Sequence, residues 1–192
     1  MSLKNVVLIL FNMYISCSTI FIIFKNVTMR NLILCCIVFM ILACNQVFSQ
    51  NTNAKALYEK NLTTLKASIT AFENEQIDAW ASNIADNAEW NPPAYGAAKG
   101  TKDDWKKALA MYMADWDSLK LRNPNFLPGI DSITHEFDGS VRYYGEWTGV
   151  HKSGVRTAVS FYGTYEFNKE GKITSGSDYF DVGGLMNAVK GK

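Results

Sequence analysis

The sequence predicts an α+β domain over residues 51–192, and two observations carry that prediction. Apolar residues recur at helical spacing from Tyr58 to Leu119. From Ile130 onward the apolar period changes to two, and glycine-containing turns separate the runs. Helices followed by a run of strands joined by short turns are typical of the α+β class.

The first 50 residues differ in composition from the rest. They hold all four cysteines and only three charged side chains, Lys4, Lys25 and Arg30. Removing these three from the 19 Lys and Arg leaves 16 against all 18 Asp and Glu, so the rest of the chain is weakly acidic. We therefore expect no nucleic-acid partner. Without cysteine, and with only two histidines, residues 51–192 predict no metal and no cofactor.

An export signal is predicted over residues 29–49. Met29 and Arg30 supply a start and a positive charge ahead of the apolar run Leu32–Ala43. Ordinary cleavage before Gln50 would give a periplasmic or secreted protein. The alternative is a lipobox ending at Cys44, whose acylation would anchor the protein to the membrane.

An earlier apolar run, Val6–Phe24, needs its own explanation. If translation begins at Met29, residues 1–28 are an upstream extension. If it begins at Met1, the run is long enough for a membrane helix. The folded domain is predicted over residues 50–192 in either case.

Two helices are predicted at the start of this domain. The first buries one stripe at steps of four and three, made of Tyr58, Leu62, Leu65, Ile69 and Phe72. The second is short, with its apolar positions at Ile77, Trp80, Ala81 and Ile84. A brief extended piece over residues 88–90 follows, ended by Pro92 and Pro93.

The third predicted helix has the clearest start signal. Thr101 is a natural N-cap, and Asp104 three residues later forms a variant of the capping box. The helix is expected to stop before Asn123 and Pro124. Its apolar stripe is Trp105, Leu109, Tyr112, Trp116 and Leu119.

Four strands are predicted after Ile130, joined into an antiparallel meander. Turns are expected at residues 138–140, 151–154 and 169–171, each containing glycine. Apolar residues of the two middle strands fall on one face of the sheet, and polar or tyrosine residues on the other. The strands are Ile133–Phe137, Val141–Val150, Arg156–Phe167 and Lys172–Asp181.

Several segments in this order resemble the NTF2-like (SnoaL-like) family, and together they span residues 54–190. They are residues 76–80 with 84–90, Gly100 with residues 103–105, and residues 171–181 with 183–186. The resemblance implies a cone in which a curved antiparallel sheet wraps three N-terminal helices. It also implies an apolar pocket at the wide end and a homodimer through the outer sheet face.

Isomerase-like members of this family use an Asp just before a Pro as general base and a Tyr in the first helix. The corresponding position here is Asn91, which cannot act as a base. Residues 68–70 supply no tyrosine. The sequence therefore argues against isomerase chemistry of that type.

Asp178 and His135 are the two remaining catalytic candidates. An inward-facing Asp178 would have a raised pKa and could act as a base. The favoured alternative is that Asp178 faces solvent or pairs with Arg142 or Arg156, because Ile173 and Tyr179 look like the buried set on that strand. His135 could transfer protons, or it could be an ordinary surface residue.

The aromatic residues are the main pointer to a ligand. Five tryptophans in this domain either fill a core or line a pocket, and they favour a flat apolar or aromatic small molecule. The predicted ligand-binding residues are Trp80, Trp90, Trp116, Tyr112 and Trp147.

Three functions follow from these observations. The first is an exported module that binds a small hydrophobic molecule, without assigned catalysis. The second is a cyclase, isomerase or hydrolase that uses Asp178 or His135. The third is an interaction module whose outer sheet face, including Arg142, Tyr144, Glu146 and Tyr162, binds a partner or a second copy.

Overall fold

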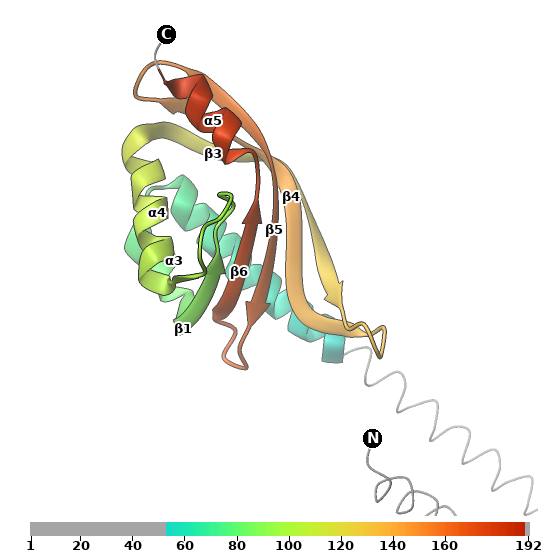
Figure 1. The fold of residues 1–192 in the computed structure, drawn as a ribbon. Helices are drawn as coiled ribbons and strands as arrows, with labels where there is room; N and C mark the ends of the chain where they lie inside the picture. Colours follow the sequence, from blue (N-terminus) through green and yellow to red (C-terminus); the bar gives the residue numbers. More distant parts are fainter. Residues whose placement is uncertain (1–52, 191–192) are drawn as a thin grey trace, which may run out of the picture. The chain divides into compact units, whose positions relative to one another are not determined.

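The computed structural model describes residues 53–190 (Figure 1). These residues form one compact unit. The predicted signal segment 29–49, the cleavage before Gln50 and the acylation of Cys44 lie outside the described residues. Within residues 53–190, none of the helices has the length and apolar character needed to cross a membrane.

The domain starts with helices and ends with a sheet and one more helix, as Figure 1 shows. The first helix covers residues 53–73. The remaining elements are α3 (Ile77–Ser82), β1 (Ile84–Asn91), β2 (Gly100–Thr101), α4 (Lys102–Asp115), β3 (Trp116–Ile130), β4 (Phe137–His151), β5 (Arg156–Phe167), β6 (Ile173–Tyr179) and α5 (Val182–Val189).

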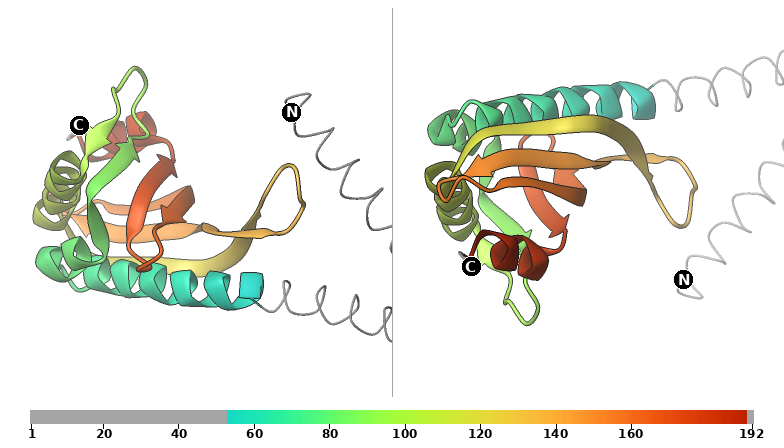
Figure 2. Two further views of the ribbon diagram at one scale, coloured as in Figure 1. Left: turned by 90° about the horizontal axis from the view of Figure 1, so that it is seen from below. Right: turned by 90° about the horizontal axis from the view of Figure 1, so that it is seen from above.

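The strands form one six-stranded sheet in the order β2-β1-β6-β5-β4-β3. The run from β3 to β6 is antiparallel throughout. This confirms the predicted meander for its last three strands, whereas β3 takes the place of the predicted first strand. The sheet as a whole is mixed, because β1 runs parallel to β6. Figure 2 shows the sheet curving around the first helix and the pair α3 and α4. The predicted α+β class and cone shape are confirmed.

The first helix packs by the stripe that its sequence predicts. Tyr58, Leu62 and Leu65 are buried, and Ile69 and Phe72 pack against the core from its edge. Burial of one face stabilises such a helix more than intrinsic propensity does. The same face also buries Asn61, whose amide donates to the carbonyl of Gly139 at 2.7 Å.

The predicted second helix is too long by one apolar position. The helix α3 ends at Ser82, and Ile84 is the first residue of β1, where it pairs with Ile173 of β6. The backbone of Ile84 is therefore extended, although its spacing from Trp80 fits a helix. Pairing with a distant strand therefore determines the backbone conformation of Ile84, in spite of its helical spacing.

The predicted end of the third helix is also wrong. The capping box of Thr101 and Asp104 is present, but α4 ends at Asp115. Trp116 and Leu119 belong to β3, which pairs with β4 along most of its length. Asn123 has a φ of 49° where the pairing register shifts between Arg122 and Asn125. An edge strand tolerates the following proline at such a bulge.

The region before β4 differs from the prediction as well. Residues 131–136 form a loop rather than the strand predicted over Ile133–Phe137. The carboxylate of Asp131 holds this loop by accepting from the backbone N–H groups of Ile133 and Thr134. Residues 138–140 are not a hairpin turn but an irregularity inside β4, with Gly139 at a φ of 83°. The predicted turns at 151–154 and 169–171 are confirmed.

The strand β6 contains a bulge that reverses its side-chain alternation. Phe167 pairs with Ile173, but Glu166 pairs with Ser175, so one step along β5 matches two steps along β6. Thr174 is the extra residue. Beyond it, the side chain of Asp178 faces the inside of the sheet.

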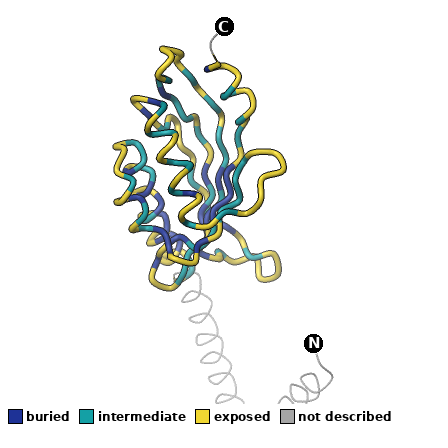
Figure 3. Tube along the Cα trace, turned by 60° about the vertical axis from the view of Figure 1, so that its left-hand side comes forward, coloured by how far each residue is buried: buried dark blue, intermediate teal, exposed yellow. Residues whose placement is uncertain are grey.

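Buried residues gather toward one end of the sheet, and the end near α5 is mostly half-buried or exposed (Figure 3). The helix α5 (Val182–Val189) includes residues 183–186, one of the segments that resemble the NTF2-like family. Its N-cap is Asp181, whose carboxylate accepts from the backbone N–H of Gly184 at 2.7 Å. This cap offsets the poor helix propensity of the two glycines in its first turn.

Candidate functional site

A cavity of about 330 Å³ lies between the inner face of the sheet and the helices. Its wall is almost entirely apolar, and all five tryptophans of the chain contribute to it. The residues that bear a polar side-chain group besides the tryptophans are Ser68, Tyr112, Tyr143, Thr148, Thr157, Tyr165 and Asp178. A concave apolar site with a few polar groups is the usual form of a small-molecule pocket.

Of the residues that the structure describes, Asp178 is the single carboxylate in the lining of this cavity, and it is 8% exposed. One of its oxygens, Oδ2, accepts from Nε1 of Trp90 at 2.8 Å. The other, Oδ1, accepts from the hydroxyl of Tyr165, also at 2.8 Å. These two donors come from β1 and β5, the neighbours of β6 on either side, so the sheet itself fixes the carboxylate.

Burial raises the pKa of Asp178 from its ordinary value of 3.8 to about 6, and the hydrogen bonds from Tyr165 and Trp90 offset part of that rise. Loss of water disfavours the charged form, whereas donors favour it. Asp178 can therefore exchange a proton close to neutral pH, which an ordinary surface aspartate cannot do.

Three tyrosines around Asp178 stay protonated at neutral pH. Burial, and then the charge of Asp178, raise the pKa of Tyr112 to about 12. The same two causes raise the pKa of Tyr143 and of Tyr165 well above 10. Below about pH 8, Asp178 is therefore the group in the cavity lining that changes charge.

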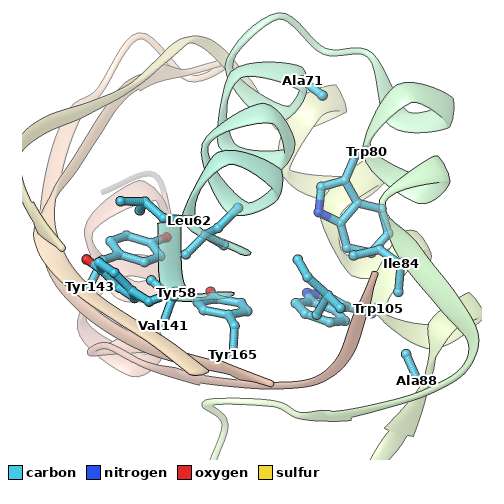
Figure 4. Packing of buried hydrophobic residues seen from close by; sticks show 12 residues of the cluster. Tyr58, Leu62, Ala71, Trp80, Ile84, Ala88, Trp105, Val141, Tyr143 and Tyr165 are labelled. Carbon is cyan, nitrogen blue, oxygen red and sulfur yellow. The ribbon is translucent and has the colours of Figure 1, made fainter. Parts of the chain in front are cut away.

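Aromatic rings form a connected layer around the cavity. Trp105 stacks on Trp90 at a centroid distance of 6.0 Å and on Tyr165 at 6.2 Å, and it meets the edge of Trp80 at 5.2 Å. Figure 4 shows the rings of Trp80, Trp105, Tyr143 and Tyr165 pointing into the same interior. The layer continues through Phe161, Phe180, Tyr112 and Trp116.

Trp105 can occupy this position because the residue of β6 that lies against its ring, Gly176, has no side chain. A Cβ placed on Gly176 would lie 2.2 Å from the indole ring of Trp105. Gly176 is thus required for the close approach of the ring to the strand, two residues before Asp178.

The predicted ligand-binding residues Trp80, Trp90, Trp116, Tyr112 and Trp147 all line this one cavity. They reach it from α3, β1, β3, α4 and β4. Their binding of a ligand stays a prediction.

The favoured expectation for Asp178 is wrong. Its side chain neither faces solvent nor pairs with Arg142 or Arg156; it is buried beside Trp90 and Tyr165. Tyr179, expected in the buried set, is 55% exposed on the outer face. The bulge at Thr174 causes both differences, because alternation counted from Ile173 fails beyond it.

His135 lies away from the cavity. It is exposed in the loop between β3 and β4, at a φ of 60°, and it is not part of the cavity lining. The structure therefore does not bring the two predicted catalytic residues together. Asn91 is likewise directed elsewhere, since its amide donates to the hydroxyl of Ser177 at 2.8 Å.

Sequence reasoning missed three residues of the site. Trp105 was expected only as part of the apolar stripe of the third helix, and Tyr143 and Tyr165 lie in the two middle strands of the predicted meander. Their membership of apolar stripes was visible, but a stripe does not distinguish a filled core from a cavity wall. In the described part of the chain, no three His, Cys, Asp or Glu side chains gather into a possible metal site.

Solved structures with similar folds support the architecture. A proposed isomerase from Bacillus subtilis is 19% identical, with a TM-score of 0.59 over 71% of this chain and 96% of its own. A proposed polyketide cyclase from Xanthomonas campestris is 13% identical, with a TM-score of 0.58 over 70% of this chain and 99% of its own. An NTF2-like protein of unknown function from Burkholderia pseudomallei is 16% identical, with a TM-score of 0.56 over 69% and 98%.

No protein-family model matches the sequence, and no curated protein matches it. The likeness is therefore one of fold, at identities too low to transfer an activity. The curved sheet and the helices that it encloses agree with these structures. This chain has the NTF2-like fold.

Proposed function

We propose that this domain binds a small hydrophobic or aromatic molecule in its cavity. The observation that carries the proposal is the cavity of about 330 Å³, lined by all five tryptophans and holding one buried carboxyl group. An apolar wall of this kind releases water when an apolar ligand enters, and aromatic faces favour flat ligands. Export of the protein is part of this proposal and rests on the sequence of residues 29–49.

Native mass spectrometry of the purified protein is the first test. We expect a co-purifying small molecule, or a ligand taken from a panel of hydrophobic compounds. Binding can be followed by tryptophan fluorescence, since every tryptophan of the chain lines the cavity.

A matched pair of variants on α4 locates the binding. Ala108 lines the cavity, whereas Ala110 is exposed on the same helix. Ala108→Leu fills part of the cavity and should weaken binding, and Ala110→Leu should leave it unchanged. Equal effects of the two variants would place the ligand somewhere else.

A second candidate function is proton transfer at a carbon acid, and the position of Asp178 favours it. A buried carboxylate with a pKa of about 6 can take a proton from a carbon next to a carbonyl, forming an enolate, and then return a proton to that carbon. Trp90 and Tyr165 hold the carboxylate in place during both steps.

This candidate can be tested by hydrogen exchange, with 2-tetralone as the probe and NMR as the readout. The protein in D₂O should speed the exchange of the α-protons, and Asp178→Asn should abolish the acceleration. Asp181→Asn is the control, because Asp181 is exposed and caps α5. No acceleration by the unaltered protein leaves simple binding as the function.

Dimerisation through the outer sheet face is a third proposal, supported by a row of tyrosines. Tyr144, Tyr162 and Tyr179 stand side by side on β4, β5 and β6, with ring centroids 5.9 and 5.7 Å apart. Tyr144 is 41% exposed and Tyr179 is 55% exposed. Contiguous exposed aromatic residues of this kind are typical of protein interfaces.

Analytical ultracentrifugation tests the dimer. Tyr144→Glu combined with Tyr179→Glu should shift a dimer to monomer. Tyr95→Glu serves as control, because Tyr95 is fully exposed in the loop between β1 and β2. A monomer in the unaltered protein would refute the proposal.

A further inference from the structure

The cavity contains a charged group without an opposite charge. Among residues 53–190, Asp178 takes part in no ion pair, and no Lys, Arg or His belongs to the cavity lining. Its partners Trp90 and Tyr165 are neutral donors. Buried charges in proteins are normally paired, because desolvation of an isolated ion is costly.

Each oxygen of Asp178 accepts one hydrogen bond from these donors, and a carboxylate oxygen can accept two. The carboxylate therefore keeps acceptor capacity toward the cavity that it lines. A donor on a ligand can occupy that capacity without displacing Trp90 or Tyr165.

The aromatic wall of the cavity, like the carboxylate, favours a positively charged ligand. Phe161 packs between Tyr143 and Phe180 at centroid distances of 5.1 and 5.8 Å, and Tyr112 follows at 6.4 Å from Phe180. The faces of aromatic rings carry partial negative charge and attract cations, most strongly where water is excluded. An anionic ligand would meet both a carboxylate and ring faces of the wrong sign.

We propose that the ligand of this cavity is an organic cation: a quaternary or protonated amine on an apolar body, with its ammonium group beside Asp178 and its body against the aromatic wall. This inference rests on the proposed binding function and adds the ligand's chemical class. It assigns the missing opposite charge to the ligand rather than to the protein.

The pH dependence of this binding has a defined sign. The groups that face Asp178 are Trp90 from β1, Tyr165 from β5, Tyr143 from β4 and Tyr112 from α4. The raised pKa values of the tyrosines keep them neutral, so the protonation of Asp178 alone removes the charge. Cation affinity should fall as the pH drops through about 6.

Two probes of nearly equal shape separate charge from apolar contact. Benzyltrimethylammonium carries a positive charge, and neopentylbenzene replaces its nitrogen with carbon. Titration of the purified protein, followed by tryptophan fluorescence at about pH 8, should show the cation binding at least about tenfold more tightly. The preference should largely disappear at about pH 5, while the affinity for neopentylbenzene stays constant.

The variant Asp178→Asn should remove the preference for the cation at about pH 8 and keep the affinity for neopentylbenzene. His151→Gln is the control, because its ring packs on Trp116 at 4.5 Å from outside the cavity lining. That variant should keep both the preference and its pH dependence.

The outcomes of these experiments test the cation proposal separately from the proposed hydrophobic pocket on which it rests. Equal binding of the two probes, or tighter binding of neopentylbenzene, overturns the cation assignment and leaves the hydrophobic pocket intact. A cation preference that survives in Asp178→Asn also overturns it. Failure of both probes to bind contradicts the pocket function itself. The comparison of probes uses the unaltered protein, so it decides the matter even if a variant does not fold.

Discussion

The indole of Trp90 and the carboxylate of Asp178 are joined by a 2.8 Å hydrogen bond between β1 and β6, the two strands that run parallel in the sheet. These strands are far apart in the sequence, and their pairing attaches the helical start of the domain to the meander. The position of the buried acid therefore depends on the pairing of β1 with β6. Its energetic consequences can be measured.

Asp178 should make the domain less stable as the pH rises from about 4 to about 6. Its pKa of about 6 in the folded protein lies above its ordinary 3.8, so the folded state binds the proton more tightly than the unfolded state does. The resulting stability is fully present below about pH 4 and is lost as the pH rises through about 6, to a total of about 3 kcal/mol.

Urea unfolding of the unaltered protein and of Asp178→Asn across this range measures the effect. The difference between their free energies of unfolding should change by about 3 kcal/mol in favour of the variant as the pH rises. Asp78→Asn is the control, because the hydrogen bond from Lys106 lowers the pKa of Asp78 and its titration therefore lies below this pH range. A difference that stays flat with pH would show that Asp178 is not desolvated.

Gly176→Ala should destabilise the domain by about 1–3 kcal/mol, because the new methyl group would overlap the buried ring of Trp105. Thermal unfolding and the tryptophan emission spectrum should both shift. Gly183→Ala is a suitable control: the nearest atom to its added Cβ is 3.7 Å away, and alanine suits the helix α5 better than glycine does. If Gly176→Ala were as stable as the parent, Trp105 would not lie on the strand.

Asn61→Ala should cost about 1–3 kcal/mol, since it removes the donor that satisfies the buried carbonyl of Gly139. The bond holds the irregular start of β4 against the first helix. Denaturant unfolding checks the value. Thr63→Ala, on the exposed side of the same helix, should change the free energy of unfolding by less than about 0.5 kcal/mol. Equal effects at the two positions would contradict the assigned role of Asn61.

Thr101→Ala should lower the free energy of unfolding by about 1 kcal/mol through loss of the N-cap of α4. The hydroxyl of Thr101 accepts from the backbone N–H of Asp104, and the carboxylate of Asp104 accepts from the backbone N–H of Thr101. Thr101→Ser keeps the acceptor and should retain most of the stability. Circular dichroism during denaturant unfolding gives both values.

Local interactions explain which parts of the fold could be predicted. The first helix and the capping box depend on residues three or four apart, so Tyr58, Leu62 and Thr101 lie where the sequence predicts. The spacing of Trp116 fits a helix equally well, yet Trp116 lies in β3 opposite His151 of β4. The extended conformation of Trp116 depends on pairing with a strand more than thirty residues away, and the local spacing of apolar residues carries no information about that partner.

The kinds of residue that line the candidate site could be predicted from the sequence, but the way in which the fold brings them together could not. The tryptophans indicated an aromatic pocket, and all five line the cavity. The neighbours of Asp178 could not be inferred, because Trp90 reaches it only through the parallel pairing of β1 with β6. Its inward orientation could not be inferred either, because a one-residue bulge leaves no mark in the hydrophobic pattern.

The bulge in β6 also makes the chemistry of the cavity depend on the pairing register of one strand. If β6 kept all its residues but paired with β5 without the bulge, Ser177 and Tyr179 would exchange faces with Asp178. The acid would move to the outer surface, and a hydroxyl and a phenol would replace it inside. A register shift of one residue, with the sequence unchanged, would therefore turn an acidic cavity into a neutral one.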